Sequence, residues 1–131
     1  MMSDPQSLVP LDKGDTERAH AAVSAGYPAV ESILPKLLEW LQDCNWPVAG
    51  VLSPFLESIG SPLIPHLRPI MSSDDLVWKY WIIGHIMGGS REVAEAFRGE
   101  LERLAYSPTD EERLNELNER AALVLQTHGW N

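Results

Sequence analysis

The chain has little that could carry redox or metal chemistry. Its 131 residues include a single cysteine, Cys44, so an internal disulfide is impossible and a thiolate-rich zinc site is excluded. Such sparing use of cysteine is typical of a reducing compartment, and we expect a cytoplasmic protein. There is no Gly-x-Gly-x-x-Gly or phosphate-binding loop, and no Gly-x-Ser-x-Gly nucleophile elbow. The sequence therefore predicts no cofactor and no metal.

Basic residues are also scarce. Ten Lys and Arg stand against nineteen Asp and Glu, which gives a formal net charge of −9. A field of this sign repels phosphate backbones and anionic lipid surfaces, so we expect no nucleic-acid and no membrane binding. The longest apolar stretch, residues 77–87, is too short for a bilayer and contains Lys79, Gly84 and His85. No targeting signal is apparent in the first ten residues.

What the sequence does have is helical periodicity. Apolar residues recur at spacings of three and four, and no sustained alternation typical of a strand occurs. We expect an all-α fold in one domain over residues 15–131. An extended arm, residues 1–14, precedes this domain, and its apolar residues Leu8, Val9 and Leu11 should pack on the body.

The cap residues and prolines divide the domain into six to seven expected helices. They run from Asp15 or Thr16 to about Ala25, from Pro28 to Leu41 with a break at Pro35, from an Asn45 cap to Ile59, from Ser61 to Met71, from Asp74 or Asp75 to Met87, from Ser90 to about Tyr106, and from a Thr109–Glu112 capping box to the last apolar residues.

A weak internal repeat pairs these helices into hairpins. The alignment that places Leu38 on Leu67 also places Leu41 on Ile70, Val48 on Val77 and Leu52 on Trp81. Each copy has an apolar helix, a short polar link and a second apolar helix, which is the arrangement of a short α-solenoid of stacked hairpins. The pattern resembles HEAT repeats, because Asp74, Val77 and Lys79 match the usual turn aspartate, valine and basic residue.

Several strings of the chain resemble a particular family. They are Leu8-Val9-Pro10-Leu11-Asp12-Lys13, residues 34–43 with the sequence LPKLLEWLQD, Asn45-Trp46-Pro47-Val48-Ala49 and Trp78-Lys79-Tyr80-Trp81. Together they resemble a bacterial family of domains of unknown function, number 5071 in the DUF series, over nearly the whole chain. The resemblance implies a compact, HEAT-like helical domain, and it brings no activity or catalytic residues with it.

Four tryptophans near the two inter-helix turns are the main candidates for a functional surface. Trp46 and Trp78, with Asp43 and Lys79 close in sequence, could line an interaction surface. The alternative is that the indoles close the ends of the hairpins as part of the core. Trp81 should belong to the core because the repeat aligns it with Leu52, whereas Trp46, at a helix start, should remain half exposed.

The remaining candidates have plainer interpretations. His66 and His85 lie on different expected helices and have no acid at helical spacing, so they do not predict a metal site. Cys44 has no flanking signature of a catalytic nucleophile. The C-terminal third contains pairs with the spacing of helix-supporting ion pairs, which predict a solvated face: Glu95–Arg98, Glu100–Arg103 and Glu116–Arg120.

These features favour a protein–protein interaction module that is not an enzyme. An acidic chain of this kind suits a partner with a basic surface, and one form would be an immunity-type protein that neutralises a toxin. The alternatives are small-molecule binding at the tryptophan-rich surface and a HEAT-like DNA glycosylase that uses Asp43 or Asp74. The glycosylase is disfavoured because it needs a basic stripe along which DNA can lie.

Overall fold

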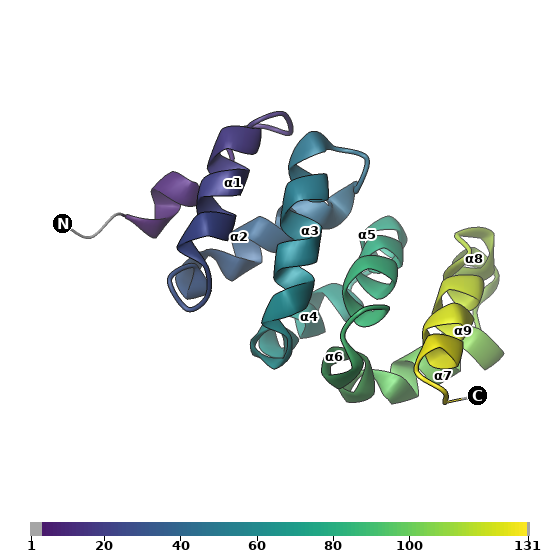
Figure 1. Ribbon diagram of the computed structural model, residues 1–131. Helices are drawn as coiled ribbons and strands as arrows, with labels where there is room; N and C mark the ends of the chain where they lie inside the picture. Colours follow the sequence, from purple (N-terminus) through teal and green to yellow (C-terminus); the bar gives the residue numbers. More distant parts are fainter. Residues whose placement is uncertain (1–3, 131) are drawn as a thin grey trace.

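The computed structural model describes residues 4–130, and every regular element in that range is helical (Figure 1). The expectation of an all-α fold is confirmed. Met1–Ser3 of the expected arm and Asn131 of the expected domain lie outside the described residues. The α-helices in residues 4–130 are α1 (Thr16–Ala25), α2 (Leu34–Glu39), α3 (Pro47–Ile59), α4 (Ile64–Met71), α5 (Leu76–Ile82), α6 (Arg91–Ala96), α7 (Arg98–Tyr106), α8 (Asp110–Leu114) and α9 (Leu117–Thr127).

Most helix starts follow the predicted caps. The side chains of Asp15, Asp75 and Ser90 each accept a backbone N–H in the first turn of α1, α5 and α6. The predicted capping box of Thr109 and Glu112 is present at the start of α8. The predicted cap of α3 was wrong. The residue before this helix is Trp46, and Asn45 does not cap it.

Three expected helices are shorter than predicted. The second does not start at Pro28, because a short 3-10 helix, Glu31–Ile33, leads directly into α2. The helix expected from Ser90 to Tyr106 breaks at Phe97, and the last one breaks at Glu116. Glu116 has a left-handed backbone with φ 61°, which ends the first segment and starts α9 in a new direction.

Successive helices pack on one another along the molecule. Helix α1 contacts α3, α3 contacts the π-helical turn Ile83–Met87 that prolongs α5, and this turn contacts α9. In Figure 1 these elements stand side by side, and α2, α4, α6 and α7 form a second row. The largest fully buried side chains come from both rows: Ile33, Leu34, Leu37, Leu38, Leu41, Leu52, Leu56, Leu63, Leu67, Ile82, Ile83 and Ile86.

The period of the repeat is one position longer than the sequence alignment predicted, which is a correction. The 3-10 helix Glu31–Ile33 is equivalent to the 3-10 helix Ser61–Leu63, and each leads into an α-helix with proline at its second position. Proline is tolerated there because its missing N–H has no partner in the first turn of a helix. With the same period, buried positions of the second helices also match: Ala49 with Lys79, Leu52 with Ile82, Ser53 with Ile83, and Leu56 with Ile86.

No single helix in residues 4–130 is long and apolar enough to cross a membrane. The bent pair Pro47–Ile59 and Ser61–Met71 passes that test by length and composition only, with a bend of 107° between its helices. Leu52, Leu56 and Leu67 of this pair are fully buried, so packing in the core accounts for the hydrophobicity of the pair.

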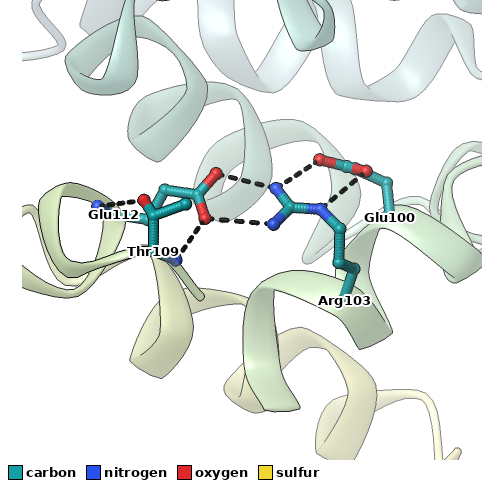
Figure 2. A network of polar contacts seen from close by, with 4 residues as sticks. All are labelled: Glu100, Arg103, Thr109 and Glu112. Atoms are coloured by element: carbon teal, nitrogen blue, oxygen red, sulfur yellow. Dashed lines mark hydrogen bonds and ion pairs between the residues drawn. The ribbon is translucent and has the colours of Figure 1, made fainter. Parts of the chain in front are cut away.

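An ion-pair network joins α7 to the start of α8 (Figure 2). The Arg103 guanidinium donates to both oxygens of Glu112, at 3.1 and 2.7 Å, and to both oxygens of Glu100, at 3.3 and 3.0 Å. Glu112 also accepts the backbone N–H of Thr109 at 2.8 Å. Hydrogen bonds from Arg103 hold the pKa of the buried Glu112 at about 2, although burial acts in the opposite direction.

Replacing Glu112 with glutamine removes this charge, so we expect Glu112→Gln to lower the free energy of unfolding at pH 7 by about 2 kcal/mol. A carboxyl whose folded-state pKa is lowered stabilises the fold above its unfolded pKa, near 4.5, and loses that effect as the pH falls toward 2. Urea denaturation at several pH values should therefore show the two proteins converging between about pH 4.5 and pH 2. A difference that stays constant over this range would contradict the role of Glu112.

The arm is attached to the body, but not by all the residues expected. Leu8 and Val9 are half-buried against the core, and the backbone carbonyl of Lys13 accepts the N–H of Val48 at 3.1 Å. The prediction that Leu11 packs on the body was wrong, because 73% of this residue is exposed. Its backbone N–H donates to the Asp15 carboxylate at 2.9 Å, which turns the chain into α1 and directs the Leu11 side chain outward.

Leu8 and Leu11 form a matched pair of substitutions in the arm. Leu8→Ala should lower the free energy of unfolding by about 1 kcal/mol, because it removes half-buried apolar area. Leu11→Ala should change it by less than about 0.5 kcal/mol. Urea denaturation measures both values, and equal effects of the two substitutions would mean that the described packing of the arm is wrong.

Candidate functional site

The link between α2 and α3 sets the position of Trp46. Asp43 accepts the backbone N–H of Asn45 on its Oδ1 at 2.9 Å, and its backbone carbonyl accepts the N–H of Trp46 at 3.1 Å. This tight turn starts α3 directly at Pro47. Both the carboxylate and the backbone carbonyl of Asp43 thus shape the turn that holds Trp46, and its predicted role as a surface contact stays a prediction.

Trp40 and Trp46 line a hollow at this end of the first hairpin. Their ring centroids are 5.7 Å apart and the planes meet at 71°, which is an edge-to-face arrangement. Neither indole Nε1 is a hydrogen-bond donor within residues 4–130 or a buried unpartnered atom, so both reach solvent. The hollow measures about 460 Å³ and is lined by Val9, Lys36, Glu39, Trp40, Gln42 and Trp46.

A second hollow of about 380 Å³ lies between α2 and α4, beside the first. Glu39 and Gln42 line both hollows, so the two adjoin. Trp78 closes the second hollow, and its indole N–H donates to the backbone carbonyl of Leu38 at 3.1 Å. The other residues that line it are mostly apolar: Pro35, Leu38, Pro65, His66, Pro69, Ile70 and Ser73. We call the two adjoining hollows the tryptophan groove.

Lys79 does not belong to the tryptophan groove, which corrects the prediction. Only 7% of the residue is exposed, so it offers little surface to a partner. Lys79 instead lines a separate hollow between α5 and α8, together with Asp74, Glu111 and Glu112. The structure thus brings Trp46 and Trp78 to one groove, uses Asp43 in its turn, and leaves Lys79 elsewhere.

The prediction that Trp81 belongs to the core was also wrong. Trp81 is only partly buried, and its ring contacts Tyr80 and His85, with centroids 5.1 and 5.6 Å away. The reason is the longer period of the repeat. The alignment of Leu52 with Trp81 was wrong by one position, which is a rotation of about 100° around a helix. Trp81 therefore corresponds to the half-buried Val51 and not to Leu52.

Sequence reasoning also missed an exposed apolar patch around Trp81. Leu114 is 84% exposed and Val77 is 51% exposed, and both line a shallow hollow with Trp81 and Tyr80. The left-handed backbone of Glu116 creates this patch by ending α8 next to α5. No sequence signal marks that break, because glutamate at a left-handed position is uncommon.

The cysteine and the histidines are not set up for catalysis or metal binding. Burial, with a smaller effect of the neighbouring Asp43, raises the pKa of the Cys44 thiol to about 12, so no appreciable thiolate is present at neutral pH. Burial also lowers the pKa of His85, and the nearby Arg120 adds to this effect. His66 lines the tryptophan groove. Residues 4–130 contain no group of three His, Cys, Asp or Glu side chains that could hold a metal ion.

The predicted ion pairs of the C-terminal third form only in part. Glu100 pairs with Arg103 at 3.0 Å, as expected. Arg98 pairs with Glu102 at 3.9 Å, and its predicted pair with Glu95 is not found in the described part of the chain. Arg120 lies over the ring of Tyr80, 3.9 Å from its centroid, and so is not paired with Glu116. Stacking on an aromatic ring competes with an exposed ion pair that contributes little in water.

Comparison with known proteins identifies the family. Residues 8–125 match the family described as Domain of unknown function (DUF5071), so the chain belongs to this family. The resemblance seen in the sequence is confirmed. No match was found among curated proteins.

Trp78 and Trp81 provide a matched test of the corrected repeat. Trp78→Phe removes the donor to the Leu38 carbonyl in a half-buried place and should lower the free energy of unfolding by about 1 kcal/mol. Trp81→Phe removes no hydrogen bond within residues 4–130, and we expect a change below about 0.5 kcal/mol. Urea denaturation of the two variants decides the point. A larger loss for Trp81→Phe would restore the alignment of Trp81 with Leu52.

Proposed function

We propose that this member of the DUF5071 family is a protein-interaction module built as a short, HEAT-like α-solenoid. The internal repeat supports the solenoid, since equivalent elements and equivalent buried positions recur in both hairpins. The successive contacts of α1, α3, the π-helical turn and α9 also support it, because a solenoid packs each unit on its neighbour.

The tryptophan groove is the observation that carries the proposal of a binding role. Two indoles, Trp40 and Trp46, reach solvent there, and a third, Trp78, closes the adjoining hollow. Tryptophan is among the residues most enriched in the side chains that dominate binding energy at interfaces, because it offers a large rigid contact area. A groove that runs along α2 and α4 suits a linear segment of a partner.

The charge of the chain supports a partner with a basic surface. A net charge of −9 steers positively charged proteins toward the molecule and repels acidic ones. An immunity-type protein that neutralises a basic toxin is one form of this function. The shielded thiol of Cys44 and the structural use of the Asp43 carboxylate support a binding role over an enzymatic one.

Small-molecule binding is the second candidate. Hollows of about 460 and 380 Å³ fall within the size range of small-ligand pockets, and this volume is the observation that favours it. The experiment that tests the first proposal also separates the two, because a small-molecule pocket has no reason to select peptide sequences.

A displayed library of random peptides, selected on the immobilised chain, tests the interaction role. We expect enriched basic sequences whose synthetic peptides bind at least about tenfold more weakly to Trp46→Ala. Gln42→Arg, which puts a bulky cation where the two hollows meet, should weaken binding similarly without removing a core contact. Trp81→Ala is the control, since this partly buried tryptophan lies outside the groove, and it should bind like the wild type.

Circular dichroism of each variant shows whether it is folded, so that a loss of binding can be assigned to the surface. The proposal is wrong if no peptide is enriched. The proposal is also wrong if the enriched peptides bind Trp46→Ala and Gln42→Arg with the same affinity as the wild type.

A further inference from the structure

We propose that the corner between Trp40 and Trp46 is a binding site for an arginine side chain that the partner presents. This inference rests on the proposed function and adds the chemistry by which the partner is recognised. The site consists of the two indole rings and the carboxylate of Glu39, all of which line the same hollow.

The two indoles form a corner because their planes meet at 71° with centroids 5.7 Å apart. In an edge-to-face pair, the ring that contributes its edge has neither face covered by its partner, and the other ring has one face partly covered. Both indoles also pack partly on the core, so the faces that border the hollow are the ones open to a ligand. The negative face of an indole attracts a cation that lies within about 6 Å of its centroid. A planar guanidinium can stack on one indole and direct its N–H groups past the other.

Arginine stacked on an aromatic ring is a recurring contact in this molecule. Arg91 and Arg98 lie over Trp130, at 5.0 and 4.8 Å from its centroid, and Arg120 lies over Tyr80. No cation of residues 4–130 lies over Trp40 or Trp46, although these rings also face solvent. The corner is therefore an aromatic pair that the described chain leaves without a cation.

Glu39 supplies the opposite charge. Its side chain is exposed at the end of α2, lines both hollows of the groove and has no ion-pair partner within residues 4–130. A carboxylate accepts two parallel N–H groups of one guanidinium, which the compact ammonium group of lysine cannot match. The combination of stacking faces and a carboxylate therefore favours arginine over lysine.

Lys36 is the one cation of the described chain that lines the hollow, and it limits the affinity of the site. It is exposed, one turn before Glu39 on the same helix, and is not within ion-pair distance of Glu39. Its charge repels an incoming guanidinium and competes for the same carboxylate. Removing this charge should raise the affinity of the site for arginine. Structural damage would lower that affinity, so an increase would point to the charge itself.

The experiment uses N-acetyl-L-arginine methylamide as the probe and the neutral isostere N-acetyl-L-citrulline methylamide as its control. The probe is titrated into the 15N-labelled full chain, and the indole N–H signals of the tryptophans are followed by NMR. We expect the signals of Trp40 and Trp46 to shift and saturate with arginine, while those of Trp81 and Trp130 stay in place. Citrulline should give no saturable shift, because it lacks the charge.

Two charge variants then test the electrostatics of the site. Glu39→Gln should weaken binding of the arginine probe by about threefold or more, and Lys36→Gln should strengthen it by about twofold or more. Both side chains are exposed, so neither variant should affect folding. Equal shifts with arginine and citrulline would overturn the inference, as would a weaker affinity of Lys36→Gln.

The outcome is separable from that of the peptide selection. If selected peptides depend on Trp46 but the arginine probe does not bind in the corner, the interaction role stands and the recognition by arginine is wrong. If the probe binds but no peptide is enriched, the corner is a site for small guanidinium compounds and the interaction role is wrong.

Discussion

The whole structure depends on an apolar core that successive short helices share. Helices of this length are marginal on their own in water, and α3, the longest in the described chain, has 13 residues. Each helix therefore exists only because one face is buried against its neighbours. The fully buried side chains come from both rows of helices, from Ala19 in α1 to Leu125 in α9. Every element gains its stability from the elements next to it.

This dependence bears on where the tryptophans lie. The core is filled mainly by Leu, Ile, Val and Ala, with Met71, Met87 and Phe97, and none of the large side chains fully buried within residues 4–130 is an indole. Trp40, Trp46 and Trp78 are instead half-buried at the ends of the hairpins, where one part of each ring packs on the core and another borders a hollow. These three side chains are therefore neither full core residues nor fully exposed, and their role in binding stays a prediction.

Local signals in the sequence predicted local structure well. The caps at Asp15, Asp75 and Ser90 and the capping box at Thr109 were identified because each depends on a side chain that satisfies a backbone N–H a few residues away. The helical class followed from the apolar periodicity. The family resemblance, now confirmed over residues 8–125, rested on strings that include the turn at Asp43 and the following Asn-Trp-Pro.

Features that depend on register or on distant packing were not predictable. A repeat alignment wrong by one position was enough to place Trp81 in the core. Lys79 was expected at the surface because it is close in sequence to Trp78, but its position on α5 buries it. Arg120 packs over Tyr80 and does not pair with Glu116 as expected, because α5 and α9 are neighbours only in the folded chain. Glu39 and Gln42 were missed for the same reason, since only the approach of α2, α3 and α4 shows that they line one groove with the tryptophans.

The indole N–H groups of Trp40 and Trp46 reach solvent at the tryptophan groove, whereas that of Trp78 is bonded to the core. Hydrogen exchange of these N–H groups, followed by NMR on the free protein, measures the difference. We expect Trp40 and Trp46 to exchange at least about tenfold faster than Trp78, whose N–H is bonded to the Leu38 carbonyl. If Trp40 and Trp46 exchange as slowly as Trp78, the groove is closed in solution and these two rings are not available to a partner.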